Sequence, residues 1–254
     1  MNNLKKMHDL GQSIWLDFFN REIMDNGMLQ KLIDEDSLSG ITSNPSIFES
    51  AVVSSPDYDD DIKRLSGEQK SNEEIFFEFA ISDIKRAADI LKPVYEKSNG
   101  RDGLVSMEVS PLLANDTEGS IKQARELWKA INRKNAMIKI PGTKEGLPAI
   151  RKCISEGINI NITLLFGLNR YREVTEAYLS GLEDRLKAKQ PIDHITSVAS
   201  FFLSRIDVLL DPVLKEKKLD KLVGEVAIAS AKEAYQIYRE VFESERFKKL
   251  EKQG

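Results

Sequence analysis

The chain has 254 residues, of which 41% are apolar and 31% are charged, and its 37 basic and 41 acidic side chains give a formal net charge of −4. This composition indicates a globular protein with a sizeable core, and the lack of a basic excess argues against nucleic acid or an anionic membrane as a partner. The single cysteine, Cys153, excludes an internal disulfide and fits a reducing compartment, so we expect a cytoplasmic protein. No signal-peptide pattern and no apolar run of about 20 residues is found.

Strand-like and helix-like runs alternate along the chain. The predicted strands are residues 13–18, 40–44, 104–109, 136–141, 158–163 and 195–201. The predicted helices are residues 22–34 (with a break at Gly27), 58–65, 73–91, 118–132, 146–155, 170–189, 203–215, 222–243 and 244–251. This alternation predicts an α/β fold with a parallel sheet covered by helices.

Polar residues alternate with apolar ones inside several predicted strands. In residues 158–163, Asn159, Asn161 and Thr163 alternate with isoleucines, and in residues 136–141 Lys139 interrupts an apolar run. Because helices separate the strands, antiparallel pairing is unfavourable, and one polar face suits the interior of a closed barrel. In such barrels the active site lies at the carboxyl ends of the strands. The polar residues near predicted strand ends are Asp17, Asn44, Glu108, Lys139, Asn161, Thr163 and Ser200.

Lys139 is the most informative of these residues. Burial lowers the pKa of a lysine, and a neutral amine can add to a ketone to form a Schiff base. The iminium ion then accepts electrons when a neighbouring carbon–carbon bond breaks, which needs an acid and a base. Asp17 and Glu108 are the candidates for these roles. A lysine that guards a sheet edge, or one whose amine reaches solvent, is the alternative reading.

The other candidates also have alternative roles. Asn44 and Asn161 could hold substrate hydroxyls and Thr163 could position a water, but Asn44 precedes a proline and could simply start a turn. Asp17 could cap a helix, and Glu108 could pair with an arginine. A polar residue near the end of every predicted strand nevertheless favours a common site.

Several segments of the chain resemble the transaldolase family of the class I aldolase superfamily. They follow one another in family order over nearly the whole chain: GQSIWLD at 11–17, GITSNPSIF at 40–48, VSMEV at 105–109, MIKIPGTKEGLP at 137–148, EGININITLLF at 156–166 and VASFFLSRID at 198–207. The resemblance implies a TIM-type (β/α)8 barrel whose Schiff-base lysine lies on the fourth strand, which corresponds to Lys139.

The resemblance also implies the reaction and the residue roles. A dihydroxyacetone unit would pass between sugar phosphates, from sedoheptulose 7-phosphate to glyceraldehyde 3-phosphate, giving erythrose 4-phosphate and fructose 6-phosphate in the pentose phosphate pathway, without metal or organic cofactor. Asp17 matches the acid/base, and Glu108 with Thr163 matches the pair that holds the catalytic water. Asn44 and Asn161 match substrate contacts, and Ser200 and Arg205 match phosphate ligands. The resemblance allows a homodimer.

A complete barrel has eight strands, whereas six are predicted here. We therefore expect residues 1–254 to form one barrel domain of about six βα units, C-terminally truncated and lacking its last two strands. Two open sheet edges and a wetter interior would leave this chain weakly active or inactive by itself.

Two other functions stay open. The first is a fructose-6-phosphate-type aldolase with another donor, although related enzymes that act on free dihydroxyacetone tend to lack a carboxylate at the position of Glu108. The second is a non-catalytic truncated barrel. No metal site is expected, because His8 and His194 lack partners at ligand spacing and Asp59–Asp61 fit the first turn of a helix.

Overall fold

The computed structural model describes residues 2–18 and 20–254. The chain divides into two compact units, one formed by Met1–Pro111 and Gln123–Ile138 and the other by Leu112–Lys122 and Lys139–Gly254. One strand and one helix contribute to both units.

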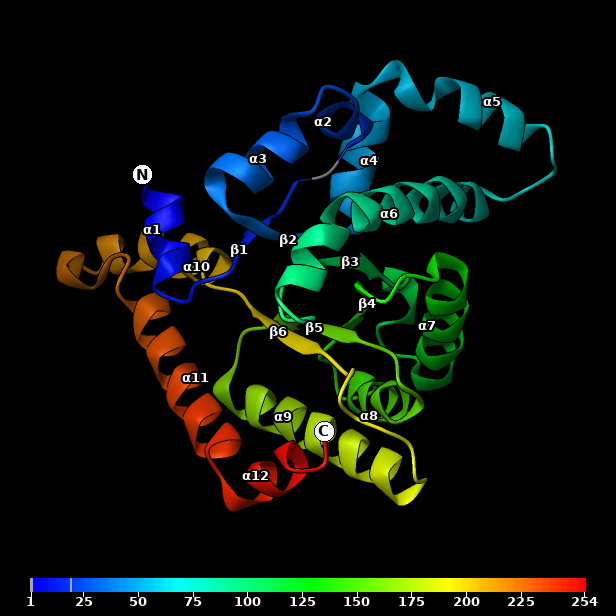
Figure 1. Ribbon diagram of the computed structural model, residues 1–254. Coiled ribbons are helices and arrows are strands. Elements are labelled where there is room, and N and C mark those ends of the chain that lie inside the picture. Colours follow the sequence, from blue (N-terminus) through cyan, green and yellow to red (C-terminus); the bar gives the residue numbers. More distant parts are fainter. Residues whose placement is uncertain (1, 19) are drawn as a thin grey trace. The chain divides into compact units, whose positions relative to one another are not determined.

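Six parallel strands follow each other in the order β1-β2-β3-β4-β5-β6 (Figure 1). Their bounds are β1 Ile14–Leu16, β2 Leu38–Thr42, β3 Leu104–Glu108, β4 Ala136–Pro141, β5 Ile160–Leu165 and β6 Ser197–Phe201. Doubly wound sheets reverse their strand order at a switch point, whereas each strand of a barrel pairs with the next one in sequence. The strand order is therefore that of an incomplete (β/α)8 barrel, which confirms the predicted fold class.

Helices connect the strands. They are α1 Asn3–Asp9, α2 Arg21–Asp25, α3 Met28–Asp36, α4 Pro45–Ser54, α5 Asp59–Ser66, α6 Asn72–Lys97, α7 Thr117–Ile131, α8 Gly146–Glu156, α9 Leu168–Lys187, α10 Ser204–Glu216, α11 Val226–Phe242 and α12 Glu245–Glu251. Short 3-10 turns are η1 Pro56–Tyr58, η2 Pro111–Leu113 and η3 Asp220–Leu222. None of the described helices is both long and apolar enough to cross a bilayer.

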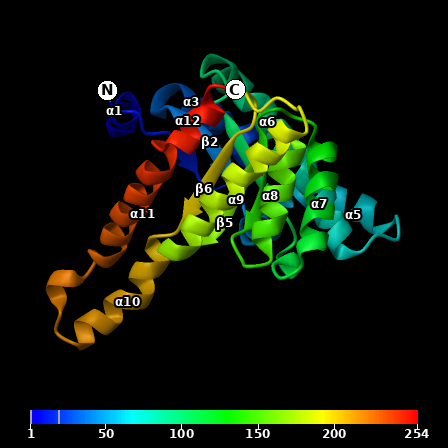
Figure 2. The ribbon, with the colours of Figure 1, turned by 90° about the horizontal axis from the view of Figure 1, so that it is seen from below.

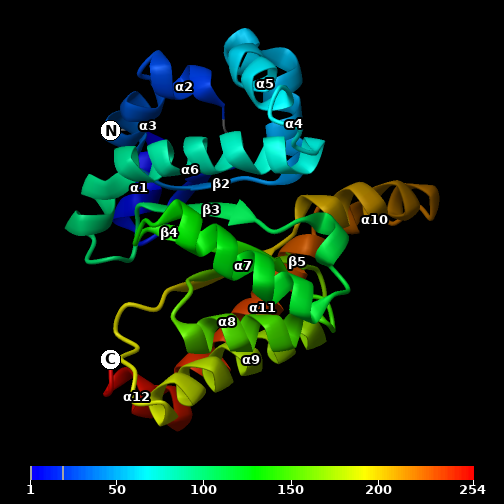
Figure 3. The same ribbon diagram turned by 90° about the vertical axis from the view of Figure 1, so that its right-hand side faces the viewer.

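In the first unit, α6 lies along β2 and β3 (Figure 3). A capping box starts this helix: the Glu74 amide donates to Ser71 Oγ, and the Ser71 amide donates to the Glu74 carboxylate. The side of α6 toward the sheet includes Ile84 and Leu91, which are fully buried. Such apolar spacing buries one stripe of a helix against the strands.

In the second unit, α8 and α9 pack side by side next to β5 (Figure 2). Ile150 and Cys153 of α8 are fully buried, so the free Cys153 is a small core residue. Gly157 ends α8 with a φ of +90°, a conformation that glycine adopts without strain. The helix extends one residue beyond the predicted range 146–155.

Most predicted elements are present, but the sequence analysis predicted no helix at α1 or α4, and several bounds differ from the predicted ones. Gly27 has a φ of +78° and separates α2 from α3, as predicted. β2 begins at Leu38 and ends at Thr42, so Asn44 follows the strand rather than closing it. β5 runs on to Leu165 because a bulge interrupts its pairing with β6 between Ile162 and Leu165.

The C-terminal helix of the second unit is held by Arg246, whose guanidinium binds two carboxylates of α9. Its nitrogens lie 2.6 Å from Glu183 Oε1 and 2.6 Å from Glu176 Oε2. Hydrogen bonds from Arg246 hold the pKa of both glutamates below the usual range.

We expect Arg246→Ala to lower the free energy of unfolding by about 1 kcal/mol at neutral pH, because two partly exposed ion pairs disappear. A depressed carboxylate pKa stabilises the fold above the unfolded pKa, and this contribution is lost as the pH falls through the folded pKa. Urea denaturation at neutral pH and below about pH 3 should therefore show the difference only at neutral pH. Arg239→Ala, which breaks an ion pair within α11, is the matched control and should cost less. A difference that persists in acid would contradict this assignment.

Candidate functional site

Three predicted site residues of the first unit share one face of its strands. The register pairs Trp15 with Gly40 and Gly40 with Leu104. Side chains of a strand alternate between the two faces, so Asp17, Asn44 and Glu108 have the parity of these paired residues. All three lie at or just beyond the carboxyl ends of β1, β2 and β3, as predicted.

Close packing between Trp15 and Gly40 explains why residue 40 is a glycine. The Trp15 indole lies over Gly40, where an added Cβ would come within 2.5 Å of the ring. Glycine at this point therefore lets the indole pack flat on β2.

Asn44 and Glu108 line one small recess of the first unit. Phe48 and Phe76 form its apolar wall, and Ser43 Oγ donates to the Ser106 carbonyl oxygen at 2.8 Å, which ties the end of β2 to β3. Asn44 and Glu108 are only partly buried, and Asp17 is exposed. Asp17 does not cap α2, because Asn20 does so by accepting from the Ile23 amide.

Thr42 is a residue of this face that the sequence analysis did not single out. Its Oγ1 is buried, and no hydrogen-bond partner for it lies among the described residues. Thr42 stands two positions before Asn44 on the same face, so the alternation that selected Asn44 could also have selected Thr42. A buried hydroxyl without a partner calls for an explanation, and its place two residues before Asn44 makes Thr42 a further candidate for the site.

In the second unit, Lys139 is buried with 4% of its surface exposed. All six residues of β4 are buried, so this lysine neither guards a sheet edge nor extends into solvent. Its neighbours Ile138 and Ile140 are fully buried on the opposite face. The structure thus confirms the predicted placement of an amine inside a buried strand.

The strand next to Lys139 carries buried polar side chains. The Gly142 amide donates to the Thr163 carbonyl oxygen at 2.8 Å, and in a parallel ladder this register places Asn161 beside Lys139. Asn161 and Thr163 are each 1% exposed. Ser200 Oγ of β6 donates to Asn161 Oδ1 at 2.8 Å. The structure thus brings together three of the predicted site residues, Lys139, Asn161 and Ser200.

Asn159, the first polar residue of the alternating segment 158–163, does not belong to this group. Asn159 Oδ1 accepts from the Thr196 amide at 2.9 Å and joins the approach to β5 with that to β6. It therefore has a structural bond at the amino end of the strand pair.

A bulge follows Thr163 directly. Leu164 has a φ of +58°, which is rare for a residue other than glycine, and pairing resumes with Leu165 opposite Phe201. Bulges beside active sites redirect side chains at the end of a strand. The positive φ of Leu164 thus directly follows Thr163 within β5.

Arg205 lies at the start of α10 and is exposed. Its guanidinium stacks on the Phe202 ring, with Cζ 4.6 Å from the centroid, and Phe202 stacks in turn on Phe166 at 5.3 Å. The stacked ring limits the orientation of the guanidinium while its hydrogen-bonding edge stays open to an anion.

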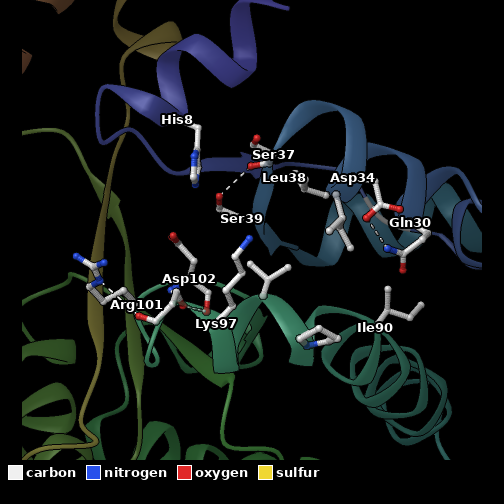
Figure 4. A pocket seen from close by; sticks show the side chains of 14 residues that line it. His8, Gln30, Asp34, Ser37, Leu38, Ser39, Ile90, Lys97, Arg101 and Asp102 are labelled. Atoms are coloured by element: carbon white, nitrogen blue, oxygen red, sulfur yellow. Dashed lines mark hydrogen bonds between the residues drawn. The ribbon is translucent and has the colours of Figure 1, made fainter. Parts of the chain in front are cut away.

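A separate pocket of about 570 Å³ in the first unit lies near the amino ends of β2 and β3 (Figure 4). Its walls include Leu38 and Ser39 of β2 and Asp102 just before β3. Catalytic groups of barrels gather at the carboxyl ends of the strands, so this pocket is at the wrong end for the candidate site. Within residues 2–18 and 20–254, no group of three or more His, Cys, Asp or Glu side chains could hold a metal ion.

These features define an α/β protein of the barrel type, with a buried lysine on β4 and amide and hydroxyl groups on the neighbouring strands. The transaldolase/fructose-6-phosphate aldolase family model matches residues 14–249. The chain therefore belongs to this family.

Individual relatives agree with the family match. Over 100% of its length the chain is 47% identical to a transaldolase of Trichodesmium erythraeum, of which it covers 70%. It is 44% identical to transaldolase 2 of a Nostoc species and 44% identical to a transaldolase of Saccharopolyspora erythraea, of which it covers 70% and 69%.

We expect Ser200→Ala to shift the side-chain amide NMR signals of Asn161, because the mutation removes the hydroxyl that donates to Asn161 Oδ1. The loss of one hydrogen bond should lower the free energy of unfolding by about 1 kcal/mol. Ser197→Ala is the matched control, since Ser197 Oγ donates to the Ile160 carbonyl oxygen at the same distance of 2.8 Å. It should cost similar stability and leave the Asn161 signals in place. Equal shifts in both variants would refute the direct contact.

Proposed function

We propose that this chain acts as a transaldolase, a transferase that moves a dihydroxyacetone unit between sugar phosphates through a Schiff base on Lys139. The observation that carries the proposal is the burial of Lys139 in β4 next to buried Asn161, in a chain of this family. An amine that is kept away from water and flanked by hydrogen-bonding groups is suited to attack a sugar ketone.

Lys139 Nζ adds to the ketone carbon, and the carbinolamine loses water to give an iminium ion. The bond between C3 and C4 then breaks as a base takes the proton of the C4 hydroxyl. C4 leaves as the aldehyde carbon of the first product, and the electron pair of the broken bond moves into the iminium to form an enamine. The enamine carbon attacks an acceptor aldehyde, whose oxygen receives the proton back from the same group. Hydrolysis of the new iminium releases the ketose product and frees the amine.

We assign the acid and base roles to groups at the carboxyl ends of the strands. Asp17 takes the hydroxyl proton, and Glu108 and Thr163 hold the water that is lost and regained. Asn44 and Asn161 hold substrate hydroxyls, the latter oriented by Ser200.

Phosphate binding falls to Arg205 and to Ser200, whose hydroxyl proton turns from Asn161 Oδ1 to the phosphate when the substrate binds. The stacked, exposed guanidinium of Arg205 offers the planar fork that suits a phosphate. Neither this role nor the acid and base roles require a metal or an organic cofactor.

We further propose one barrel domain for residues 1–254, a cytoplasmic location, a place in the pentose phosphate pathway and a homodimer. The single cysteine supports the location, and membership of the family supports the barrel domain and the pathway. The aldolase alternative, with free dihydroxyacetone as donor, is less favoured because Glu108 supplies a carboxylate in the recess with Asn44.

Borohydride reduction in the presence of fructose 6-phosphate should trap a reduced dihydroxyacetone adduct on Lys139, detected by peptide mass spectrometry. Lys139→Met should abolish the adduct. Lys144→Met is the matched control, because Lys144 is an exposed lysine in the loop after β4 and should leave the adduct intact. A folded chain without an adduct on Lys139 would favour the non-catalytic reading.

We expect Glu108→Gln to slow transfer from sedoheptulose 7-phosphate to glyceraldehyde 3-phosphate by about a hundredfold or more relative to the unchanged chain, because proton transfer through the held water is lost. A coupled assay of fructose 6-phosphate formation measures this rate, and free dihydroxyacetone as donor should give little product with either protein. Faster use of free dihydroxyacetone by the unchanged chain would instead support the aldolase.

A further inference from the structure

Arg21, the first residue of α2, joins three segments of the first unit. Its Nε donates to Asp83 Oδ1 of α6 at 2.9 Å, and its Nη1 donates to the Asp57 carbonyl oxygen of η1 at 2.8 Å. Its Nη2 lies 2.7 Å from Asp61 Oδ2 of α5. The guanidinium plane also covers the Tyr58 ring, with Cζ 4.4 Å from the centroid. All three nitrogens and one face of the fork are thus engaged.

The electrostatic surroundings make Arg21 hard to replace. Asp83 is 3% exposed, and burial raises the pKa of its carboxyl while the positive charge of Arg21 opposes this rise. The hydrogen bond from Arg21 lowers the pKa of Asp61. A variant without the guanidinium would leave a buried carboxylate without its counter-ion, which is strongly destabilising in proteins.

An aromatic row leads from Arg21 to the recess of Asn44 and Glu108. The row consists of Tyr58, Phe79, Phe76 and Phe48, whose successive ring centroids lie 5.4, 5.7 and 5.8 Å apart. All three pairs meet edge to face, and Phe76 and Phe48 form the apolar wall of the recess. Close-packed rings cannot move independently, so a shift of Tyr58 is transmitted to that wall.

We propose that Arg21 is a positioning residue that holds one active-site segment of the first unit in place: the segment from Asn44 to Tyr58, which walls the recess beside Glu108. This inference rests on the proposed function for its catalytic consequence. Its structural consequence, the fixing of residues 44–58, does not depend on that function.

The experiment compares Arg21→Ala and Arg21→Lys with the matched control Arg133→Ala. Arg133 forms a two-pronged ion pair with Asp89, which lies on the same helix α6 but outside the aromatic row. Amide hydrogen exchange of residues 44–58 and the kcat and KM for the transaldolase reaction are measured for each protein, together with the global free energy of unfolding.

Arg21→Ala should speed amide exchange in residues 44–58 by more than its loss of global stability explains. It should also lower kcat roughly tenfold and keep KM within about twofold, because misplaced groups slow the reaction without weakening substrate binding. Arg21→Lys, which keeps the charge without the fork, should fall between this variant and the unchanged chain. Arg133→Ala should change neither readout. If Arg21→Ala does not fold, Arg21→Lys and Asp61→Asn give the same comparison.

Two results would overturn the proposal. One is exchange in residues 44–58 that rises only as much as global unfolding does. The other is a kcat that stays at the level of the unchanged chain. If the unchanged chain shows neither transfer nor a borohydride-trapped adduct on Lys139, the proposed function fails, while the exchange measurement still decides the role of Arg21.

Discussion

The burial of one amine is the constraint on which the candidate site depends. Lys139 keeps only 4% of its surface exposed in a strand whose six residues are all buried. A cationic side chain is costly to desolvate, so a protein keeps it in such a place only with compensating polar groups. The register that sets Asn161 beside it, and the bond from Ser200 to Asn161, supply such groups. In the proposed function, the same groups hold the hydroxyls of the bound sugar.

The first unit meets a different requirement, which is to hold groups of the strand ends in place although they are only partly buried. Loops at the carboxyl ends of parallel strands carry catalytic groups but lack the hydrogen-bond ladder that fixes the strands. Here the compensation comes from outside the loops. Arg21 ties α2 to η1, α5 and α6, and a row of packed aromatic rings continues this support to the recess wall. The Arg21 contacts and the aromatic row, which lie outside the loops, thus make the site of the first unit rigid.

Several predictions from the sequence agree with the structure for a local reason. The alternation of polar and apolar residues in a strand and the caps and breaks of helices are fixed by neighbours a few positions away. Gly27 ends one helix and begins another because only its left-handed backbone allows the turn. The strand around Lys139 has the predicted bounds because a short, mainly apolar run of six residues between turn residues is typical of a buried strand. Thr42 was missed although its parity matched, since a threonine in a strand is ordinary until its hydroxyl is found without a partner.

The sequence by itself determined the alternation of strands and helices, the buried lysine on the fourth strand and the family to which the segments belong, because these follow from local periodicity and from short motifs. Tertiary structure alone decided which side chains meet. The Arg21–Asp83 bond joins residues 62 positions apart, the Ser200–Asn161 bond joins residues 39 apart, and the bulge at Leu164 appears only when β5 pairs with β6. Such contacts depend on how distant segments pack, and no local pattern in the chain encodes them.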